Sequence, residues 1–247
     1  MKTTIIRTTA IVGALLAFLG ASAQVSAQPP ALDTAFANVF DSPTSGDCGG
    51  GYCFGSGWGI PDLKATVAGN TNTLQPNFNT YNDNPGNAYW LNNGGAGPLG
   101  NKTFEGNLYY EQVVPIGATT MEFNGTVDAF TLDPGYTAVA FVTVRPGGAP
   151  LAAPTQALTA TGAFSISLDI SAFAGETIQA GFRMTGLNAN PADEGALGSV
   201  VTTVAQLEAV IPPPPPAPVV TPVPVLPFWG ILGLIGLVGF LGLRRRV

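Results

Sequence analysis

The two cysteines are the residues of this chain whose chemistry is easiest to assign. Cys48 and Cys53 are its only thiols, and four residues, three of them glycine, separate them. A disulfide across this loop is expected in an oxidising compartment. A metal site would need further Cys or His ligands, and a redox Cys-x-x-Cys motif has a gap of two residues rather than four. We therefore predict a disulfide that staples the loop and contributes about 2 kcal/mol, and we predict no cofactor.

The 247-residue chain contains no histidine. This absence excludes Ser-His and Cys-His nucleophile pairs and nearly all catalytic zinc sites. The hydrolytic chemistry that remains is a pair of carboxylates acting on a glycosidic bond. The candidate carboxylates are Glu105, Glu111, Asp193 and Glu194, and no spacing singles out one pair. A glycoside hydrolase is therefore an alternative, and a protein without enzymatic activity is the expectation.

Aromatic side chains among asparagine-rich loops form a second group of candidates. Rings that stack on sugars, together with amides that hydrogen-bond to hydroxyl groups, would bind a polysaccharide. The same rings could instead bury their area against the core. The candidate ligand-binding residues are Trp58, Tyr81, Tyr89 and Trp90, with Tyr109 and Tyr110 as further aromatic faces.

Two clusters of oxygen-bearing side chains have ligand types that suit calcium. The clusters are Asn82, Asp83 and Asn84, and Asn188, Asn190, Asp193 and Glu194. Neither has the spacing of a calcium-binding loop, and Asn or Asp beside Pro and Gly also forms turns. A calcium-stabilised surface protein therefore stays an alternative, and no metal site is predicted.

The elements that must position these residues are strands. Apolar residues recur at every second position in several segments, which is typical of half-buried strands, and one segment is apolar on both faces, as in a central strand. The predicted strands cover 65–68, 88–91, 121–127, 136–144, 164–170 and 178–184. Turn-forming residues separate them, including those at 188–193. We therefore predict an all-β body, an antiparallel β-sandwich of jelly-roll or immunoglobulin-like type.

Charge is distributed unevenly along the chain. All 15 acidic residues lie between Asp33 and Glu208. Only four basic residues lie in the same stretch, so the body has a net charge of −11. Such a body repels nucleic acid and anionic lipid, and no nucleic-acid partner is expected.

Residues 1–27 have the three parts of a secretory signal peptide. Lys2 and Arg7 give a positive start, residues 10–20 are apolar, and small residues stand at Ala23 and Ala27. We predict export through the secretion translocase.

The C-terminal end is predicted to hold the body at a membrane. Residues 211–224 form a proline-rich linker that could extend over roughly 40 Å. In 225–247, an uncharged apolar run precedes three arginines. A helix over 228–243 would be about 24 Å long and would nearly cross the hydrocarbon core. The arginines would stay in the cytoplasm, so the body, residues 28–210, would lie outside it.

The tail resembles a known class of sorting signal. The residues that carry the resemblance are Val223, Pro224, Val225, Leu226, Trp229 and Gly230, followed by the apolar run and by Arg244, Arg245 and Arg246. They are similar to the IPTL-CTERM variant of the signals recognised by exosortase-type enzymes of Gram-negative bacteria. That motif runs Ile-Pro-Thr-Leu, two residues, then Trp-Gly, and Val225 stands in place of its Thr.

The resemblance covers 223–247 and implies a second partner, a membrane transpeptidase or protease. Such an enzyme would cut near the motif and pass the body to the cell surface or extracellular matrix. A plain single-span anchor is the alternative for the same residues. The body loosely resembles the β-sandwich modules found ahead of such tails, and carbohydrate-binding modules. The prediction is an exported, non-enzymatic surface protein for which glycan binding is a candidate role.

Overall fold

The computed structural model describes residues 28–83, 89–91, 99–151 and 154–218. The strands are β1 (Thr34–Asp41), β2 (Tyr52–Gly57), β3 (Ala65–Ala68), β4 (Thr71–Leu74), β5 (Leu99–Val113), β6 (Thr120–Phe130), β7 (Thr137–Arg145), β8 (Thr155–Leu158), β9 (Gly162–Asp169), β10 (Thr177–Ala189) and β11 (Val200–Val210). The helices are α1 (Asn79–Asp83) and α2 (Glu194–Leu197), with 3-10 turns η1 (Pro61–Leu63), η3 (Pro146–Gly148) and η4 (Pro191–Asp193).

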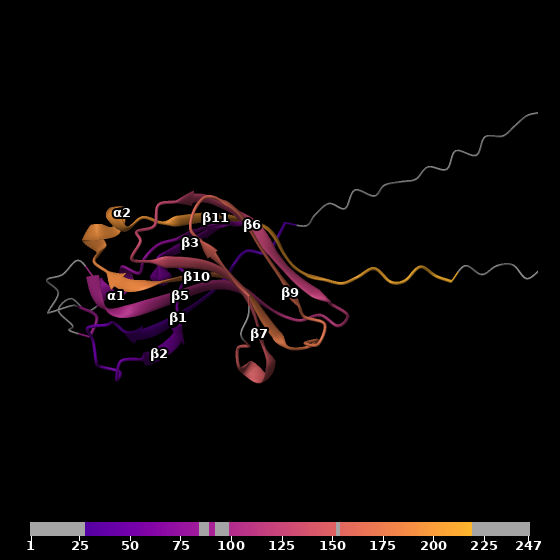
Figure 1. Cartoon of the computed structure of the whole chain (residues 1–247), viewed down its shortest axis with the longest axis horizontal. Coiled ribbons are helices and arrows are strands. Elements are labelled where there is room, and N and C mark those ends of the chain that lie inside the picture. Colours follow the sequence, from indigo (N-terminus) through magenta and orange to yellow (C-terminus); the bar gives the residue numbers. More distant parts are fainter. Residues whose placement is uncertain (1–27, 84–88, 92–98, 152–153, 219–247) are drawn as a thin grey trace, which may run out of the picture. The chain divides into compact units, whose positions relative to one another are not determined.

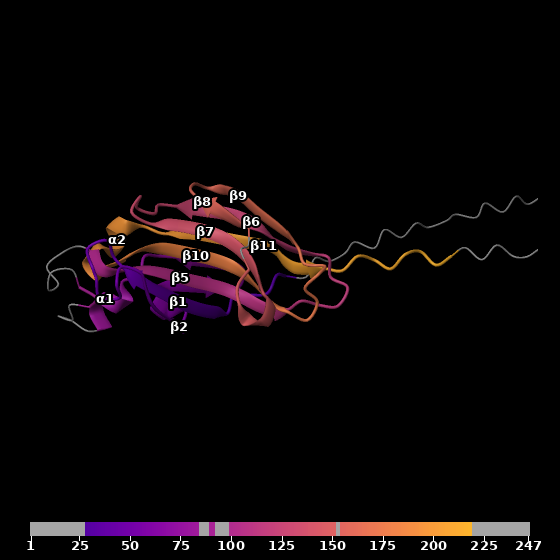
Figure 2. The ribbon, with the colours of Figure 1, turned by 60° about the horizontal axis from the view of Figure 1, so that its bottom comes forward.

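The strands form two antiparallel sheets, which confirms the prediction of an all-β body. The six-stranded sheet has the order β2-β1-β5-β10-β7-β8, and the five-stranded sheet has the order β3-β4-β11-β6-β9. Figures 1 and 2 show them as two layers, with α1 and α2 at the same end of the sandwich. Strands that are consecutive in the chain often lie in different sheets. The connections β5–β6, β6–β7 and β10–β11 all pass from one sheet to the other.

The core lies between the sheets and is built from the alternating apolar positions. Phe123 on β6 and Phe164 on β9 contribute from the five-stranded sheet, and Phe182 on β10 contributes from the six-stranded sheet. The three ring centroids lie 5.2–5.4 Å apart, and each side chain is almost fully buried. Each aromatic pair adds about 1 kcal/mol beyond the area it buries, so this cluster ties the two layers together.

Most of the predicted strands are present. The prediction at 65–68 coincides with β3, and those in the second half overlap β6, β7, β9 and β10, with Tyr136 just before β7 and Ile170 just after β9. The prediction at 88–91 is wrong for Tyr89 and Trp90, which lie in a turn, while Leu91 makes only an isolated bridge to Gly100. The Trp90 carbonyl instead accepts hydrogen bonds from the Asn101 N–H and the Asn188 side chain.

The predicted turn at 188–193 begins later than expected. β10 continues through Ala189, and the Asn188 side chain is fully buried. Its amide bonds to two backbone groups, the Lys102 N–H at 3.0 Å and the Trp90 carbonyl at 3.0 Å. A buried asparagine with both ends of its amide satisfied is stable within a strand. The chain turns only at η4, where Asn190 accepts a hydrogen bond from the Ala192 N–H.

The predicted signal peptide (1–27) and transmembrane segment (225–247) lie outside the described residues. The chain divides into two compact units, with a boundary between Pro212 and Pro213. The described part of the proline-rich linker has no regular secondary structure and is exposed. Among the helices of the described ranges, none has the length and apolar character needed to cross a bilayer.

Candidate functional site

An open groove of about 670 Å³ crosses the outer face of the six-stranded sheet. It forms because side chains that leave the sheet alternate with side chains that enter the core. On β5, Leu108 is buried in the core while Asn107 and Tyr109 line the groove. Every strand of the sheet contributes: Phe36 and Asn38 (β1), Tyr52 (β2), Asn107, Tyr109 and Glu111 (β5), Phe141, Val142, Thr143 and Arg145 (β7), Thr155 (β8), and Gln179 and Arg183 (β10), with Pro150 and Leu151 from the β7–β8 connection.

Aromatic rings make up part of the groove floor. Tyr109 and Phe141 lie edge to face with their centroids 6.4 Å apart, and both are paired with Gly181 across the sheet. A Cβ atom at Gly181 would overlap the Leu108 carbonyl oxygen and the Tyr109 backbone. The missing side chain therefore lets the β5 backbone approach β10 closely at the point between the two rings. On the edge strand β2, Tyr52 is 57% exposed and presents an open ring.

A polar network lies beside these rings. Glu105 Oε1 accepts a hydrogen bond from Asn38 Nδ2 at 2.8 Å and lies 3.5 Å from Arg183 Nε. The same Nε donates to Asn107 Oδ1 at 2.8 Å. Asn107 Nδ2 in turn donates to the Phe36 carbonyl at 3.3 Å. These bonds hold the amides and the guanidinium in fixed positions on the sheet.

The charged side chains of the groove also make contacts within the protein. The Arg183 guanidinium lies 5.3 Å from the centroid of Phe141, in a cation–π arrangement. Gln179 Nε2 donates to Glu111 Oε2 at 2.6 Å, and Arg145 donates to the Gly148 carbonyl at 2.8 Å. Burial raises the pKa of the Tyr109 phenol, and Glu111 raises it further against the opposing effect of Arg145. That hydroxyl therefore stays protonated at neutral pH and can donate a hydrogen bond.

A second polar cluster lies in the loop between β1 and β2. The Lys102 ammonium is fully buried and contacts Asp41 Oδ1 at 3.2 Å, Asp47 Oδ2 at 2.6 Å and Ser45 Oγ at 2.5 Å. The Tyr89 ring lies 4.3 Å from the same nitrogen. Burying an ammonium ion is tolerable only when it is paired and hydrogen-bonded, as it is here.

Asp41 connects this cluster to the loop backbone. Its Oδ2 accepts hydrogen bonds from the Cys48 and Gly50 N–H groups, both at 2.8 Å. Burial alone would raise the pKa of Asp41, but the bonds from Gly50, Cys48, Ser45 and Lys102 outweigh burial and lower it to about 2. Hydrogen bonds to Lys102 and Ser45 likewise lower the pKa of Asp47. Both carboxylates are therefore charged at neutral pH.

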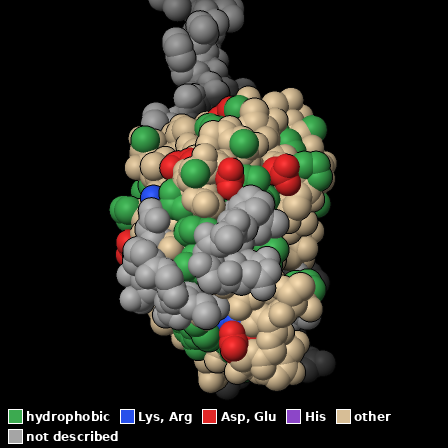
Figure 3. Space-filling model, turned by 90° about the vertical axis from the view of Figure 1, so that its left-hand side faces the viewer, with side chains coloured by type: hydrophobic (Ala, Val, Ile, Leu, Met, Phe, Trp, Pro, Cys, Tyr) green, Lys and Arg blue, Asp and Glu red, His purple; other side chains and the backbone are tan. Residues whose placement is uncertain are grey.

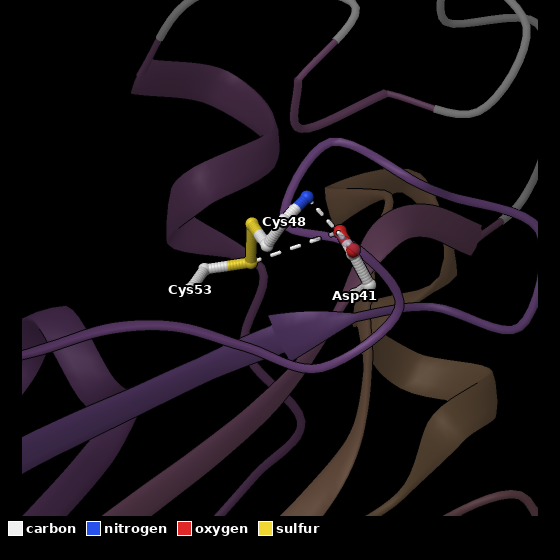
Figure 4. Close-up of side chains that lie close together, drawn as sticks. All are labelled: Asp41, Cys48 and Cys53. Atoms are coloured by element: carbon white, nitrogen blue, oxygen red, sulfur yellow. Dashed lines mark hydrogen bonds between the residues drawn. A yellow bond between two sulfur atoms is a disulfide. The ribbon is translucent and has the colours of Figure 1, made fainter.

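The predicted Cys48–Cys53 disulfide is confirmed. Figure 4 shows both cysteines beside the Asp41 carboxylate. The three side chains place potential ligand atoms within 4.8 Å of one another. Because both sulfurs are joined to each other, neither is a thiolate that could bind a metal. Asp41 and the disulfide therefore fix the conformation of the β1–β2 loop.

The four aromatic residues chosen from the sequence lie away from the groove lining. Trp58 packs on Phe104 with centroids 5.2 Å apart, and Tyr81 is only 8% exposed. Tyr89 and Trp90 lie together, at 4.9 Å, near the Lys102 cluster. Figure 3 shows the end of the sandwich near α1 and α2, where the visible hydrophobic side chains are scattered among neutral and acidic ones.

The structure gives no reason to pair the candidate carboxylates or to favour the calcium alternative. Glu105 and Glu111 lie six residues apart on β5, roughly 20 Å along a strand, whereas the carboxylates of glycosidases lie within about 10 Å of each other. Asp193 and Glu194 lie at the η4–α2 junction. Asn188 is occupied by backbone partners, and of the cluster at 82–84 the structure describes no side chain.

Sequence reasoning missed most of the groove. Of the aromatic residues it considered, only Tyr109 lines it. Phe36, Phe141 and Arg183 occupy outer positions of strands whose inner positions carry the apolar pattern. The sequence pattern that could have indicated the groove is a large or charged residue at a strand position that faces away from the core. Arg183 is such a residue within the predicted strand 178–184.

Comparison with known proteins gives little further information. No family model and no curated protein matches the chain. One solved structure that resembles it belongs to a study of the promiscuous specificity of carbohydrate-binding modules from the β-sandwich superfamily. It shares 11% identity, covers 74% of this chain and 94% of its own, and has a TM-score of 0.27. A score this low supports no conclusion about ligand or ancestry. The class defined by the fold and the site is a β-sandwich with an open groove on one sheet.

Proposed function

We propose that this protein is an exported, non-enzymatic β-sandwich module that binds a glycan in the groove of its six-stranded sheet. The observation that carries the proposal is the composition of that groove, which places aromatic rings beside amides and a guanidinium on one open face. Ligand sites commonly enclose roughly 300–1,000 Å³ and combine apolar walls with a few placed polar groups. The groove has both properties.

A sugar chain fits this chemistry better than an apolar ligand. One face of a pyranose ring is rich in C–H groups and packs on an aromatic ring, while its hydroxyl groups need hydrogen-bond partners. Tyr52 and Phe36 offer rings on the β1–β2 side, and Asn107, Gln179 and Arg183 offer polar groups across β5 and β10. Because the groove is open along the sheet, an extended polymer could lie in it.

A glycan array with the purified protein, followed by affinity measurement on the retained glycans, tests the proposal. Tyr52→Ala should weaken binding about tenfold, because it removes a stacking surface. It should lower the melting temperature only slightly, because the ring is 57% exposed and loses one edge contact, with Phe40. The control is Ile116→Ala, which removes a side chain that is 89% exposed and outside the groove. Failure of every glycan to bind, or equal affinity of the wild type and Tyr52→Ala, would refute the assignment.

The same measurement separates binding from catalysis. A binding module retains the glycan unchanged. Release of new reducing ends, lost in Glu105→Gln or Glu194→Gln, would instead support a carboxylate-dependent hydrolase.

We further propose that the C-terminal segment delivers this module to the cell surface or matrix by way of a sorting enzyme. The signal-like residues 1–27, the motif at 223–230 and the terminal arginines support this proposal. The Cys48–Cys53 disulfide fits an oxidising, extracytoplasmic location.

A further inference from the structure

The basic side chains of the body differ in whether they are buried and in whether they line the groove. Of the four between Asp33 and Glu208, Lys102 is buried and paired with two aspartates. Lys64 follows η1 and takes no part in the groove lining. The other two, Arg145 and Arg183, both line the groove. Every basic group of the body that is available to a large ligand, apart from Lys64, therefore lies on this one face.

Arg183 is oriented as a ligand-binding group would be. Its Nε atom donates to Asn107 and lies 3.5 Å from Glu105, and its Cζ atom lies 5.3 Å from the centroid of the Phe141 ring. Within the described ranges, no hydrogen bond of its two terminal NH2 groups is found, and the side chain is 36% exposed. A guanidinium held by one edge presents the other edge as a paired donor, which matches the two oxygens of a carboxylate.

Arg145 lies at the far end of the same groove. Its strand partner on β10 is Thr177, six residues before Arg183, which places the two arginines roughly 20 Å apart along the sheet. One of its terminal NH2 groups donates to the Gly148 carbonyl, whereas Arg183 meets Asn107 and Glu105 through Nε alone. The end with Arg183 is therefore the better site for an anionic group, and Arg145 is a secondary contact.

We propose that the groove takes an acidic polysaccharide, one with uronic-acid residues, and that Arg183 binds a uronate carboxylate through its terminal NH2 groups. This inference rests on the proposed glycan-binding function and names the class of glycan. The Phe141 ring beneath the guanidinium and the Glu105–Asn107 anchor behind it keep Arg183 in place before the ligand arrives, which reduces the entropy lost on binding.

The net negative charge of the body should repel an acidic polysaccharide only weakly once the two are in contact. The net charge of −11 is spread over the whole body. At physiological ionic strength its field is screened beyond about 8 Å, whereas a partly buried contact is screened much less. Repulsion by the body should slow encounter with a polyanion, and the paired contact at Arg183 should then hold it.

The test compares acidic polymers with their carboxyl-reduced forms, which have the same backbone and stereochemistry but no carboxylate. A panel of polyuronates and their reduced counterparts is titrated into the wild type, Arg183→Gln and Lys64→Gln. The two variants lose the same charge, but only the first loses it in the groove. The wild type should bind at least one polyuronate about tenfold more tightly than its reduced form. Arg183→Gln should abolish this preference, and Lys64→Gln should keep it.

The outcomes separate the two proposals. Equal affinity of the wild type for each acidic polymer and its reduced form overturns the acidic assignment and leaves glycan binding standing. A preference that persists in Arg183→Gln overturns the role of Arg183. Absence of binding to either form of every polymer also overturns the acidic assignment, and glycan binding is overturned with it only if the glycan array shows no ligand. The melting temperature of each variant, measured alongside, confirms that the folded protein was compared.

Discussion

A single glycine, Gly181, allows the backbones of β5 and β10 to pack closely beside the groove. Gly181 faces outward from β10, directly between Tyr109 on β5 and Phe141 on β7. Both rings lie low on the sheet, with Tyr109 only 7% and Phe141 only 3% exposed. Any residue with a Cβ at this position would have to displace a neighbouring backbone segment as well as a ring.

We predict that Gly181→Ala destabilises the protein by about 2 kcal/mol, because the added methyl group overlaps the Leu108 carbonyl and the Tyr109 backbone. Chemical denaturation measures this effect. Glycan affinity should fall in the same variant, because displacement of the Tyr109 backbone shifts a ring that lines the groove.

Gly57→Ala is the matched control, because a Cβ there has no neighbour within 4 Å and β2 is an edge strand. It should leave stability and binding within experimental error. A Gly181→Ala protein as stable as this control would show that β5 and β10 move apart freely.

At the scale of elements, the β1–β2 connection is held by charge as well as by the disulfide. Asp41 ends β1, Lys102 enters from the neighbouring strand β5, and the two meet beneath the loop. The Asp41 carboxylate also bonds to two N–H groups of the Cys48–Cys53 segment. Loss of its charge should therefore loosen a loop that the disulfide alone only closes.

We predict an acid-sensitive contribution from Asp41. Its pKa in the folded protein is about 2, below the ordinary value of 3.8. Because the folded-state pKa is depressed, the stabilisation is complete above about pH 4 and is lost as the pH falls toward 2. Urea unfolding of the wild type and Asp41→Asn should show a large stability difference at pH 6 that shrinks across this window.

Asp33→Asn, an exposed aspartate outside the loop, serves as the control. A difference between the wild type and Asp41→Asn that stays constant from pH 6 to pH 2 would contradict the proposed contribution of the charge.

The alternation of apolar residues predicted the strands whose outer faces are polar, and it failed for a strand whose outer face carries aromatic residues. β6, β9 and β10 were predictable because polar residues occupy much of their outer faces. β1 was not predicted, because Phe36 and Phe40 occupy its outer face and break the alternation. β7 looked apolar on both faces for the same reason, since Phe141 belongs to the groove.

The groove itself depends on the register between strands. Gly181 comes to lie between Tyr109 and Phe141 only through pairings between distant parts of the chain, and no local pattern encodes that alignment. The disulfide, in contrast, was predictable because the sequence offers a single pairing of two cysteines.

At the scale of the whole chain, the sandwich is a separate compact unit that ends at Pro212. None of the residues that line the groove belongs to the terminal segments proposed to direct export and sorting, 1–27 and 223–247. Their removal should therefore leave the groove and the core unchanged, since every residue used in the site belongs to the sandwich.

Intact-mass analysis of the surface-released protein tests the proposed processing. We expect an N-terminus at Gln24 or Gln28 and a C-terminus near the motif at 223–230, without the apolar run. A mature chain that keeps residues 231–247 would instead indicate a plain anchor. Full-length protein with residues 1–27 retained, recovered from the cytosol, would contradict export.

The strand that leads into the linker and the groove belong to different sheets. The linker continues from β11, which is in the five-stranded sheet, whereas the groove crosses the six-stranded sheet. If a polymer held in the groove pulls against an anchored tail, the load must pass from one layer to the other. The Phe123–Phe164–Phe182 cluster and the connections between the sheets would then bear the tension, so resistance to shear would depend on side-chain packing rather than on the hydrogen-bonded ladders.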